Sequence, residues 1–190
     1  MARTAVVGIV VVLAVVGFTA AALLVRPGGS PSSTPSASSS MKITSSAFSE
    51  GGTIPEKYTA DGINVSPPLG ISGVDPAATG LALIVEDLDA GNFTHWIIWN
   101  IPPNTENIPD DIQSSDIVTS SGAVEGVNDF GNLSYGGPDP PAGPAHRYRF
   151  KLFALNSVLS LESGATKAQL EQAVSGHVIA EATLTGTYGR

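Results

Sequence analysis

The chain has no cysteine among its 190 residues. It can therefore form no disulfide, has no thiolate nucleophile, and offers no cysteine ligand to zinc or to an iron–sulfur cluster. The same absence excludes a lipid-modified N-terminal cysteine. A chain of this length has room for one domain and an extension, and about 150 residues bury a sizeable core without such cross-links.

Positive charge is scarce beyond the first forty residues. The nine Lys and Arg residues include Arg3 and Arg26, so residues 41–190 contain seven basic residues against all 17 acidic ones, a formal net charge of −10. An acidic domain without a basic stripe is not expected to bind nucleic acid or an anionic membrane surface through its overall charge. A local cationic pocket remains compatible with this balance.

The longest uncharged stretch lies near the N-terminus. Residues 5–25 contain no charge and no proline, and about 20 apolar residues at ~1.5 Å each span a bilayer core. Two interpretations are open. One is a cleaved signal peptide with small residues around 19–22 at its cleavage site, and the other is an uncleaved signal-anchor, which the continuing apolar run at 23–25 favours. Both place residue 41 onward outside the cytoplasm, because the positive charge lies N-terminal.

Composition divides the chain into three predicted parts. Residues 1–26 form the signal peptide or signal-anchor, which would be an N-terminal hydrophobic helix. Residues 27–40, PGGSPSSTPSASSS, have too little apolar surface to offset the entropy of ordering, so we predict a disordered linker. Residues 41–190 form the globular domain. The protein would be membrane-anchored with this domain outside the cytoplasm, or secreted if residues 1 to about 22 are removed.

The globular part is dominated by strand patterns. The apolar run 81–85 is typical of a strand covered on both faces, and Phe93–Ile101 is rich in aromatic and β-branched residues. Further strands are predicted at 41–48, 69–74, His146–Leu155 and Val178–Tyr188, and a short strand or turn at 122–127 within the long loop 105–132. One amphipathic helix is predicted at 167–175, with Thr166 as N-cap and Gly176 ending it. The pattern indicates a mainly β domain, a sandwich or barrel.

Alternation along the strands assigns polar side chains to faces. It places Asp87 on the face of Leu81, Leu83 and Val85, and it places His95 on the face of Ile97 and Trp99. The connection 88–92 is short enough for an adjacent antiparallel pair, which would bring Asp87 and Asp89 near His95. In the strand that starts at His146, alternation groups His146 with Tyr148, and Arg147, Arg149 and Lys151 on the opposite face, expected at the solvent or at an edge.

Residues 136–143 form a Gly/Pro-rich bend, GGPDPPAG, directly before His146. Proline fixes φ and lacks an N–H, so we expect a stiff loop here. Such a loop either delivers His146 and Tyr148 to a binding site or is merely a turn before a strand with both residues half-buried.

Three kinds of chemistry are conceivable for a cluster of Asp87, Asp89, His95, His146 and Tyr148. A serine hydrolase lacks support, because no G-x-S-x-G elbow is present. Two histidines and a carboxylate can bind a divalent metal, but their separations match no ligand spacing. An anion pocket fits best, because imidazole N–H, phenol O–H and loop N–H groups all donate to phosphate or carboxylate, and a nearby aspartate raises the pKa of a histidine.

Two blocks resemble the phosphatidylethanolamine-binding protein family, in particular its bacterial branch of Raf kinase inhibitor-like proteins. VEDLDAGNFTHWIIWNIP at 85–102 is similar to the family's Asp-Pro-Asp-Ala-Pro block with its downstream His, and YGGPDPPAGPAHRYRFKLFAL at 135–155 is similar to its Gly-x-Pro-Pro…His-Arg-Tyr block. YTADGINVSPPL at 58–69 and GHVIAEATLTGTYGR at the end add weaker similarity. Leu88 and Gly91 stand where the family usually has prolines, and Ile71 stands where it has a tryptophan.

The resemblance implies a large antiparallel sheet, a smaller second sheet and C-terminal helical structure around a small cavity for phosphate-like anions and phospholipid head groups. It implies a cavity lined by Asp87, His95, His146 and Tyr148, with Asp89 orienting the adjacent loop. The cavity wall would be Gly137, Pro138, Pro140 and Pro141. The departures from the family pattern put the rigidity of the pocket in question.

The sequence therefore predicts an extracytoplasmic ligand-binding domain with no cofactor, no metal and no nucleic-acid partner. Its partners would be a small anion or a phospholipid head group, and the membrane through the N-terminal segment. Inhibition of an unidentified protein target is a further role that the family name suggests. The alternative is a hydrolase that uses His and Asp, with or without a metal.

Overall fold

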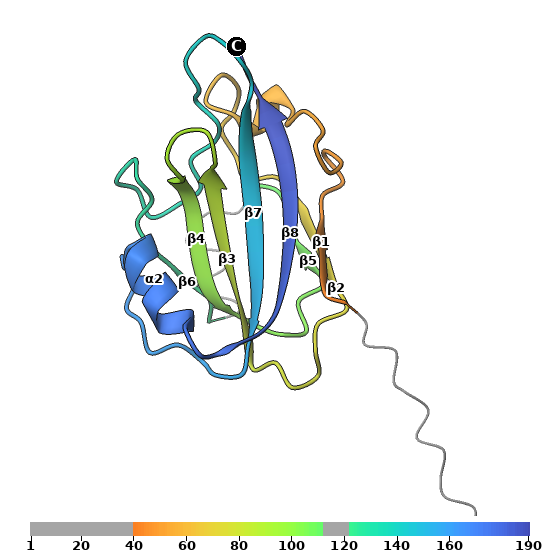
Figure 1. Cartoon of the computed structure of the whole chain (residues 1–190), viewed down its shortest axis with the longest axis vertical. Coiled ribbons are helices and arrows are strands. Elements are labelled where there is room, and N and C mark those ends of the chain that lie inside the picture. Colours follow the sequence, from red (N-terminus) through yellow and green to blue (C-terminus); the bar gives the residue numbers. More distant parts are fainter. Residues whose placement is uncertain (1–39, 112–121) are drawn as a thin grey trace, which may run out of the picture. The chain divides into compact units, whose positions relative to one another are not determined.

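A computed structural model describes residues 40–111 and 122–190. In these ranges the chain forms two antiparallel sheets, a five-stranded one with the order β6-β4-β3-β7-β8 and a three-stranded one with the order β1-β2-β5 (Figure 1). The elements are β1 Lys42–Thr44, a 3₁₀ turn Glu56–Tyr58, β2 Leu69–Ser72, β3 Gly80–Asp87, β4 Phe93–Ile101, β5 Asn107–Ile108, β6 Val124–Glu125, β7 His146–Leu155, α2 Lys167–Val174 and β8 Val178–Tyr188.

This architecture confirms the prediction of a mainly β fold with a large sheet, a smaller sheet and one short helix in the C-terminal region. The expected N-terminal helix and the linker at 27–40 lie outside the described residues, apart from Ser40. Neither helix found in 40–111 and 122–190 has the length and hydropathy that a bilayer crossing requires.

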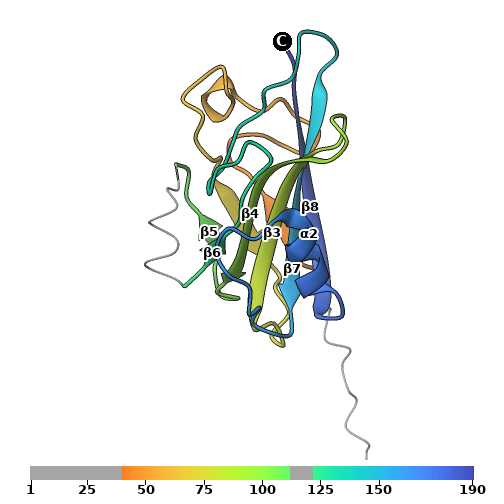
Figure 2. The same cartoon turned by 90° about the vertical axis from the view of Figure 1, so that its left-hand side faces the viewer.

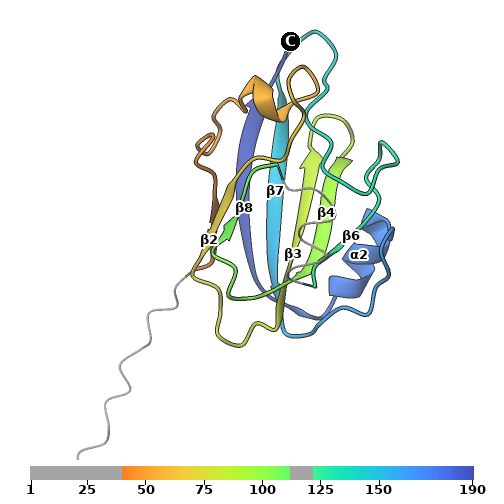
Figure 3. The same cartoon turned by 180° about the vertical axis from the view of Figure 1, so that it is seen from behind.

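Strand β3 occupies the centre of the large sheet, and all eight of its residues are buried. Its odd-numbered face packs with Trp96, Phe150 and the small sheet, and its even-numbered face packs with Trp99 and Leu170 of α2. Figure 2 shows the large sheet edge-on between α2 and the small sheet, and Figure 3 shows the small sheet in front. The continuous apolar run at 81–85 follows from this burial on both faces.

A β-bulge corrects one of the predicted face assignments. Val85 pairs with Trp96, but Glu86 pairs with Thr94, so His95 is an extra residue on β4. Ile97 lies in the core that faces α2, whereas Trp96 lies in the core between the sheets. Simple alternation predicted that His95 shares the face of Ile97 and Trp99, and this prediction is wrong. The bulge turns its side chain to the side of Asp87, a use of bulges that is frequent beside functional sites.

The neighbouring acids of β3 point in opposite directions, and Glu86 belongs to a structural ion-pair cluster on the α2 side. Its buried carboxylate accepts from the guanidinium of Arg149 on β7 and from Lys167 Nζ of α2, the latter at 2.6 Å. Burial opposes ionisation, but the hydrogen bonds and charges of Lys167 and Arg149 outweigh it and lower the pKa of Glu86. Of the basic face of β7, Arg147 is exposed as expected, whereas Arg149 and Lys151 are half-buried.

Capping fixes the start of α2 next to this cluster. The N–H of Gln169 donates to Thr166 Oγ1, and the N–H of Thr166 donates to Gln169 Oε1 at 2.9 Å, which confirms Thr166 as the N-cap. Lys167 in the first turn is thereby placed over Glu86. The carboxylate of Glu86 thus links the end of β3 to the start of α2 and to β7.

We expect Glu86→Gln to lower the free energy of unfolding by about 2 kcal/mol, because two cations then share a neutral partner in a buried site. Glu181→Gln is the matched control, since Glu181 pairs with Lys151 at 3.2 Å on the exposed side of β8. Its expected cost is about 0.5 kcal/mol or less. Urea denaturation of both variants measures the difference, and equal losses would contradict the structural role of Glu86.

Candidate functional site

A cavity of about 250 Å³ opens at the end of the large sheet where β3 ends and where β4 and β7 begin, the end marked by the C-terminus in Figure 1. It is lined by the strand ends, the 88–92 connection, the loop before β7 and a residue of the 126–135 segment. The lining residues are Asp87, Ala90, Phe93, His95, Phe130, Asp139, Pro140, Pro141 and His146.

The side chains of Asp87 and His146 contact each other in this cavity. His146 Nδ1 lies 2.7 Å from Asp87 Oδ2, and Asp87 Oδ1 accepts the N–H groups of Asp89 and Ala90 at 2.9 and 3.2 Å. A carboxylate that already accepts two backbone donors orients the imidazole so that Nδ1–H points at it. The nitrogen that His146 can still offer to a ligand is Nε2.

The ring of His95 is also oriented by a hydrogen bond from Nδ1, but to a different acceptor. Its Nδ1 lies 2.7 Å from the carbonyl oxygen of Gly136, which can only accept, so Nδ1 carries the proton and donates. The ring packs edge-on against Phe93, Phe130 and Tyr148 at centroid distances of 5.2–5.4 Å. Burial lowers the pKa of His95, and the carbonyl of Gly136 and the charge of Asp87 offset this only partly.

Tyr148 is not among the residues that line the cavity. Its hydroxyl is buried and makes no hydrogen bond to any residue in the described ranges. Burial raises the pKa of Tyr148, and the nearby charge of Asp87 raises it further, although the geometry between the two groups falls short of a hydrogen bond. The predicted face of Tyr148 is right, and its ring supports His95 from below.

Asp89 also lies outside the lining, and it holds the 88–92 connection to β7. Its carboxylate accepts from Arg147 Nη2 and Nε at 2.8 and 3.0 Å and from the Arg147 N–H at 2.8 Å. These hydrogen bonds lower the pKa of Asp89 to about 2. The N–H of Leu88 donates to the carbonyl of Arg147 at 2.9 Å. Hydrogen bonds thus fix this connection in the absence of the prolines that Leu88 and Gly91 replace.

The Pro-rich loop divides into a docked part and a lining part. Gly137 and Pro138 lie against the 58–64 turn: the Gly137 N–H donates to Asn64 Oδ1 at 2.7 Å, and the Ala60 N–H donates to the Pro138 carbonyl at 2.9 Å. Pro140 and Pro141 line the cavity. Of the nine residues proposed from the sequence, five therefore meet at the cavity, and Asp89, Gly137, Pro138 and Tyr148 support it from outside.

Sequence reasoning missed Ala90, Phe93, Phe130 and Asp139 in the lining. Phe93 pairs with Asp87 across β3 and β4, so the strand register could have identified it. Phe130 lies in a loop without a regular pattern. Asp139 stands between two prolines, where no periodicity indicates the direction of a side chain.

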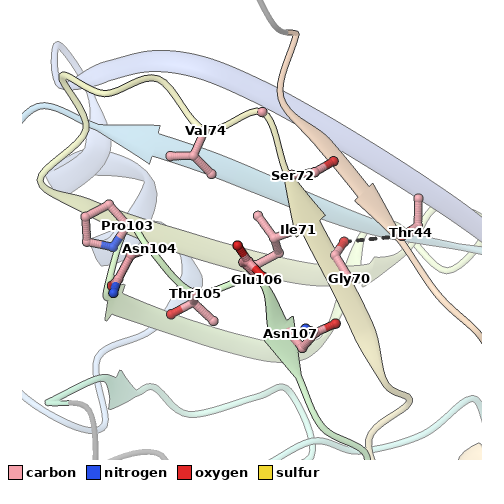
Figure 4. A pocket seen from close by; sticks show the side chains of 11 residues that line it. Thr44, Gly70, Ile71, Ser72, Val74, Pro103, Asn104, Thr105, Glu106 and Asn107 are labelled. Atoms are coloured by element: carbon pink, nitrogen blue, oxygen red, sulfur yellow. Dashed lines mark hydrogen bonds between the residues drawn. The ribbon is translucent and has the colours of Figure 1, made fainter.

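A larger hollow, of about 530 Å³, lies far from this site beside β2 and β5 (Figure 4). Hydroxyl and amide side chains dominate its lining, and Glu106 is its one charged residue. None of the described residues around it is a histidine, lysine or arginine, so it offers no cation to an anionic ligand. The described ranges also contain no group of three or more His, Asp and Glu residues arranged to hold a metal ion.

Comparisons with known proteins agree on one family. The family model described as phosphatidylethanolamine-binding protein matches residues 44–189. A UPF0098 protein of Methanothermobacter thermautotrophicus is 48% identical over 156 residues, which cover 79% of this chain and 99% of that protein. A UPF0098 protein of Pyrococcus abyssi is 46% identical, with coverage of 79% and 86%.

Two crystal structures are similar over most of the chain. The phosphatidylethanolamine-binding protein homologue CT736 of Chlamydia trachomatis has a TM-score of 0.72 and 42% identity, covering 80% of this chain and 99% of that one. YbcL of E. coli, described as a member of the mammalian PEBP family, has a TM-score of 0.73 and 30% identity, with coverage of 79% and 98%.

Proposed function

The chain belongs to the phosphatidylethanolamine-binding protein family, and from this premise we propose that its cavity binds a phosphate-like anion, either free or as the head group of a phospholipid. Family membership supports a ligand-binding domain of regulatory type. The proposal adds the chemistry of the ligand and a location outside the cytoplasm, with the N-terminal segment as membrane anchor or signal peptide. The mass of the native N-terminus distinguishes those two.

The observation that supports anion binding is the arrangement of the two imidazoles. Both have Nδ1–H committed to a fixed acceptor, Gly136 for His95 and Asp87 for His146, and both line one cavity. When either ring is protonated, its Nε2–H becomes a charged donor for an oxyanion. A protonated His146 would also be stabilised by Asp87, whose Oδ2 lies 2.7 Å from Nδ1.

The size of the cavity limits the ligand. A volume of about 250 Å³ equals roughly eight waters at about 30 Å³ each. That space accommodates a tetrahedral oxyanion with a short polar substituent, and it is too small for acyl chains. A phospholipid would therefore insert its head group only.

Isothermal titration of the full chain with inorganic phosphate, phosphoethanolamine and vesicles of phosphatidylethanolamine tests the proposal and separates its two sources of ligand. His146→Asn keeps a donor for Asp87 but removes Nε2, so we expect phosphate to bind about tenfold more weakly. His177→Asn is the matched control, because His177 does not line the cavity. Its Nδ1 lies 3.0 Å from Asn156 Oδ1. Equal affinity in both variants, or no binding by the wild type, would reject the proposal.

The Asp87–His146 pair also supports a second candidate function, since a carboxylate that orients an imidazole is the usual arrangement of a general base. The lining residues include no serine or threonine, so the nucleophile would be water. A panel of phosphomonoesters and carboxylic esters, with and without added divalent metal, tests this hydrolase alternative. Turnover that is unchanged in His146→Asn would reject it.

A further inference from the structure

A second carboxylate, Asp139, lines the cavity and forms an ion pair with Arg190, a residue beyond the end of β8. Arg190 Nη2 lies 2.6 Å from Asp139 Oδ1, and Nη1 donates to the carbonyl of Pro140 at 3.0 Å. Both of these partners belong to the Pro-rich wall of the cavity. The guanidinium itself is not among the lining groups.

The same guanidinium is anchored on its other side by Asp61 of the 58–64 turn. Arg190 Nε and Nη2 contact Asp61 Oδ2 and Oδ1 at 2.7 and 2.6 Å, and the Tyr188 hydroxyl donates to Asp61 at 2.7 Å. These hydrogen bonds, that of Arg190 first, lower the pKa of Asp61 to about 2. Arg190 is therefore shared between a carboxylate at the cavity and a carboxylate outside it.

The charges of Asp139 and Arg190 also act on Tyr148, whose ring contacts His95. At the buried hydroxyl of Tyr148, the charge of Asp139 raises the pKa and the charge of Arg190 lowers it. The two charges thus act with opposite sign on this hydroxyl. Without Arg190, a cavity that already contains Asp87 would have an uncompensated second carboxylate, which would repel an anion.

We propose that Arg190 compensates the charge of Asp139 and so makes anion binding possible beside this carboxylate, without touching the ligand. This inference rests on the proposed function, because it concerns the affinity of the same site. It also explains why a wall that contains an acid can belong to an anion site.

Four proteins test the inference: the wild type, Arg190→Gln, Asp139→Asn and the double variant, each as the full chain titrated with inorganic phosphate at a pH below the histidine titration. Arg190→Gln is expected to weaken phosphate binding about fivefold at low salt, and less at high salt. Asp139→Asn should bind at least as tightly as the wild type. The double variant should regain wild-type affinity, because the repelling charge is gone.

Asp61→Asn separates compensation from attachment. It removes one anchor of Arg190 but adds no charge to the cavity, so its phosphate affinity should stay within about twofold of the wild type. A purely structural role of Arg190 predicts the reverse: weaker binding in Asp61→Asn, and a double variant as weak as Arg190→Gln. That pattern would overturn the inference.

A measurement without ligand distinguishes failure of this inference from failure of the proposed function. In Arg190→Gln, NMR titration should show the histidines of the cavity with a raised pKa, since Asp139 is no longer compensated, and Asp139→Asn should reverse the shift. If these shifts occur but the wild type does not bind phosphate, the proposed function fails and the charge coupling stands. If phosphate binds and neither the shift nor the rescue occurs, the inference fails.

Discussion

Sulfate should bind the full chain at least about tenfold more weakly at about pH 8 than at about pH 6, because coupled uptake of one proton weakens binding by up to about tenfold for each pH unit. Sulfate stays a dianion over this range, so the slope reports protons bound by the protein alone. The anion requires the protonated imidazole, and burial lowers the pKa of His95, so this ring is neutral in the free protein over most of the range. Binding must then include uptake of a proton, which becomes more costly as pH rises.

Several charged groups face His95 and determine the steepness of this dependence. Asp87 from β3 and Asp129 from the adjacent loop favour the protonated ring. Asp139 and His146 line the same cavity, and the ring of Tyr148 contacts that of His95 from β7. Among the described residues that line the cavity, no other group has an ordinary pKa between pH 6 and pH 8, so the two histidines are the expected source of the slope.

Calorimetry in two buffers of different ionisation heat measures the proton uptake directly, and we expect about one proton per sulfate at about pH 7.5. His95→Asn keeps a donor for Gly136 and should flatten the profile, whereas His177→Asn should leave it unchanged. A sulfate affinity that is independent of pH would show that the imidazoles do not supply the donors.

The position of Asp87 and its proximity to β4 could be predicted, because both follow from alternation along a strand and from the order of strands in the chain. Alternation from Leu81 placed Asp87 on the correct face of β3, and the short 88–92 connection placed β4 beside it. The bulge at His95 could not be read in the same way, because one extra residue reverses every later side chain and leaves no mark in composition. Proximity to Asp87 was predicted correctly, and the face shared with Ile97 and Trp99 was not.

The supporting groups were harder to predict because their partners are distant in sequence. Arg190 and its partner Asp61 are 129 positions apart in the sequence. Gly137 and its partner Asn64 in the 58–64 turn are 73 positions apart. Such contacts follow from how the Pro-rich loop and the turn are packed, not from any local periodicity. Asp87 and Glu86 show the same limit, since two adjacent acids belong to a cavity and to a structural cluster only because of what covers each face.

Gly137→Ala is expected to lower the free energy of unfolding by about 3 kcal/mol and to weaken phosphate binding by more than about tenfold. A Cβ at this position would lie 2.5 Å from the Tyr58 carbonyl oxygen, 2.7 Å from Asn64 Oδ1 and 2.8 Å from Thr59 Cα. Two of these atoms are backbone, so the loop itself must move away. We expect this movement to break the hydrogen bond between Gly137 and Asn64 and to displace Pro140 and Pro141, which line the cavity.

Gly80→Ala provides the matched control within the same domain. A Cβ on Gly80 at the start of β3 would approach no atom closer than 3.9 Å, an ordinary contact, and alanine favours an extended strand over glycine. Its stability and phosphate affinity should stay within about 1 kcal/mol of the wild type. Urea denaturation and phosphate titration of both variants measure these two effects.

If Gly137→Ala lowered stability but not affinity, the loop would stabilise the domain without shaping the cavity. Equal behaviour of the two variants would instead mean that the 58–64 turn yields to the new methyl group. Only a joint loss of stability and affinity fits a glycine whose role is to let two backbones meet behind the cavity wall.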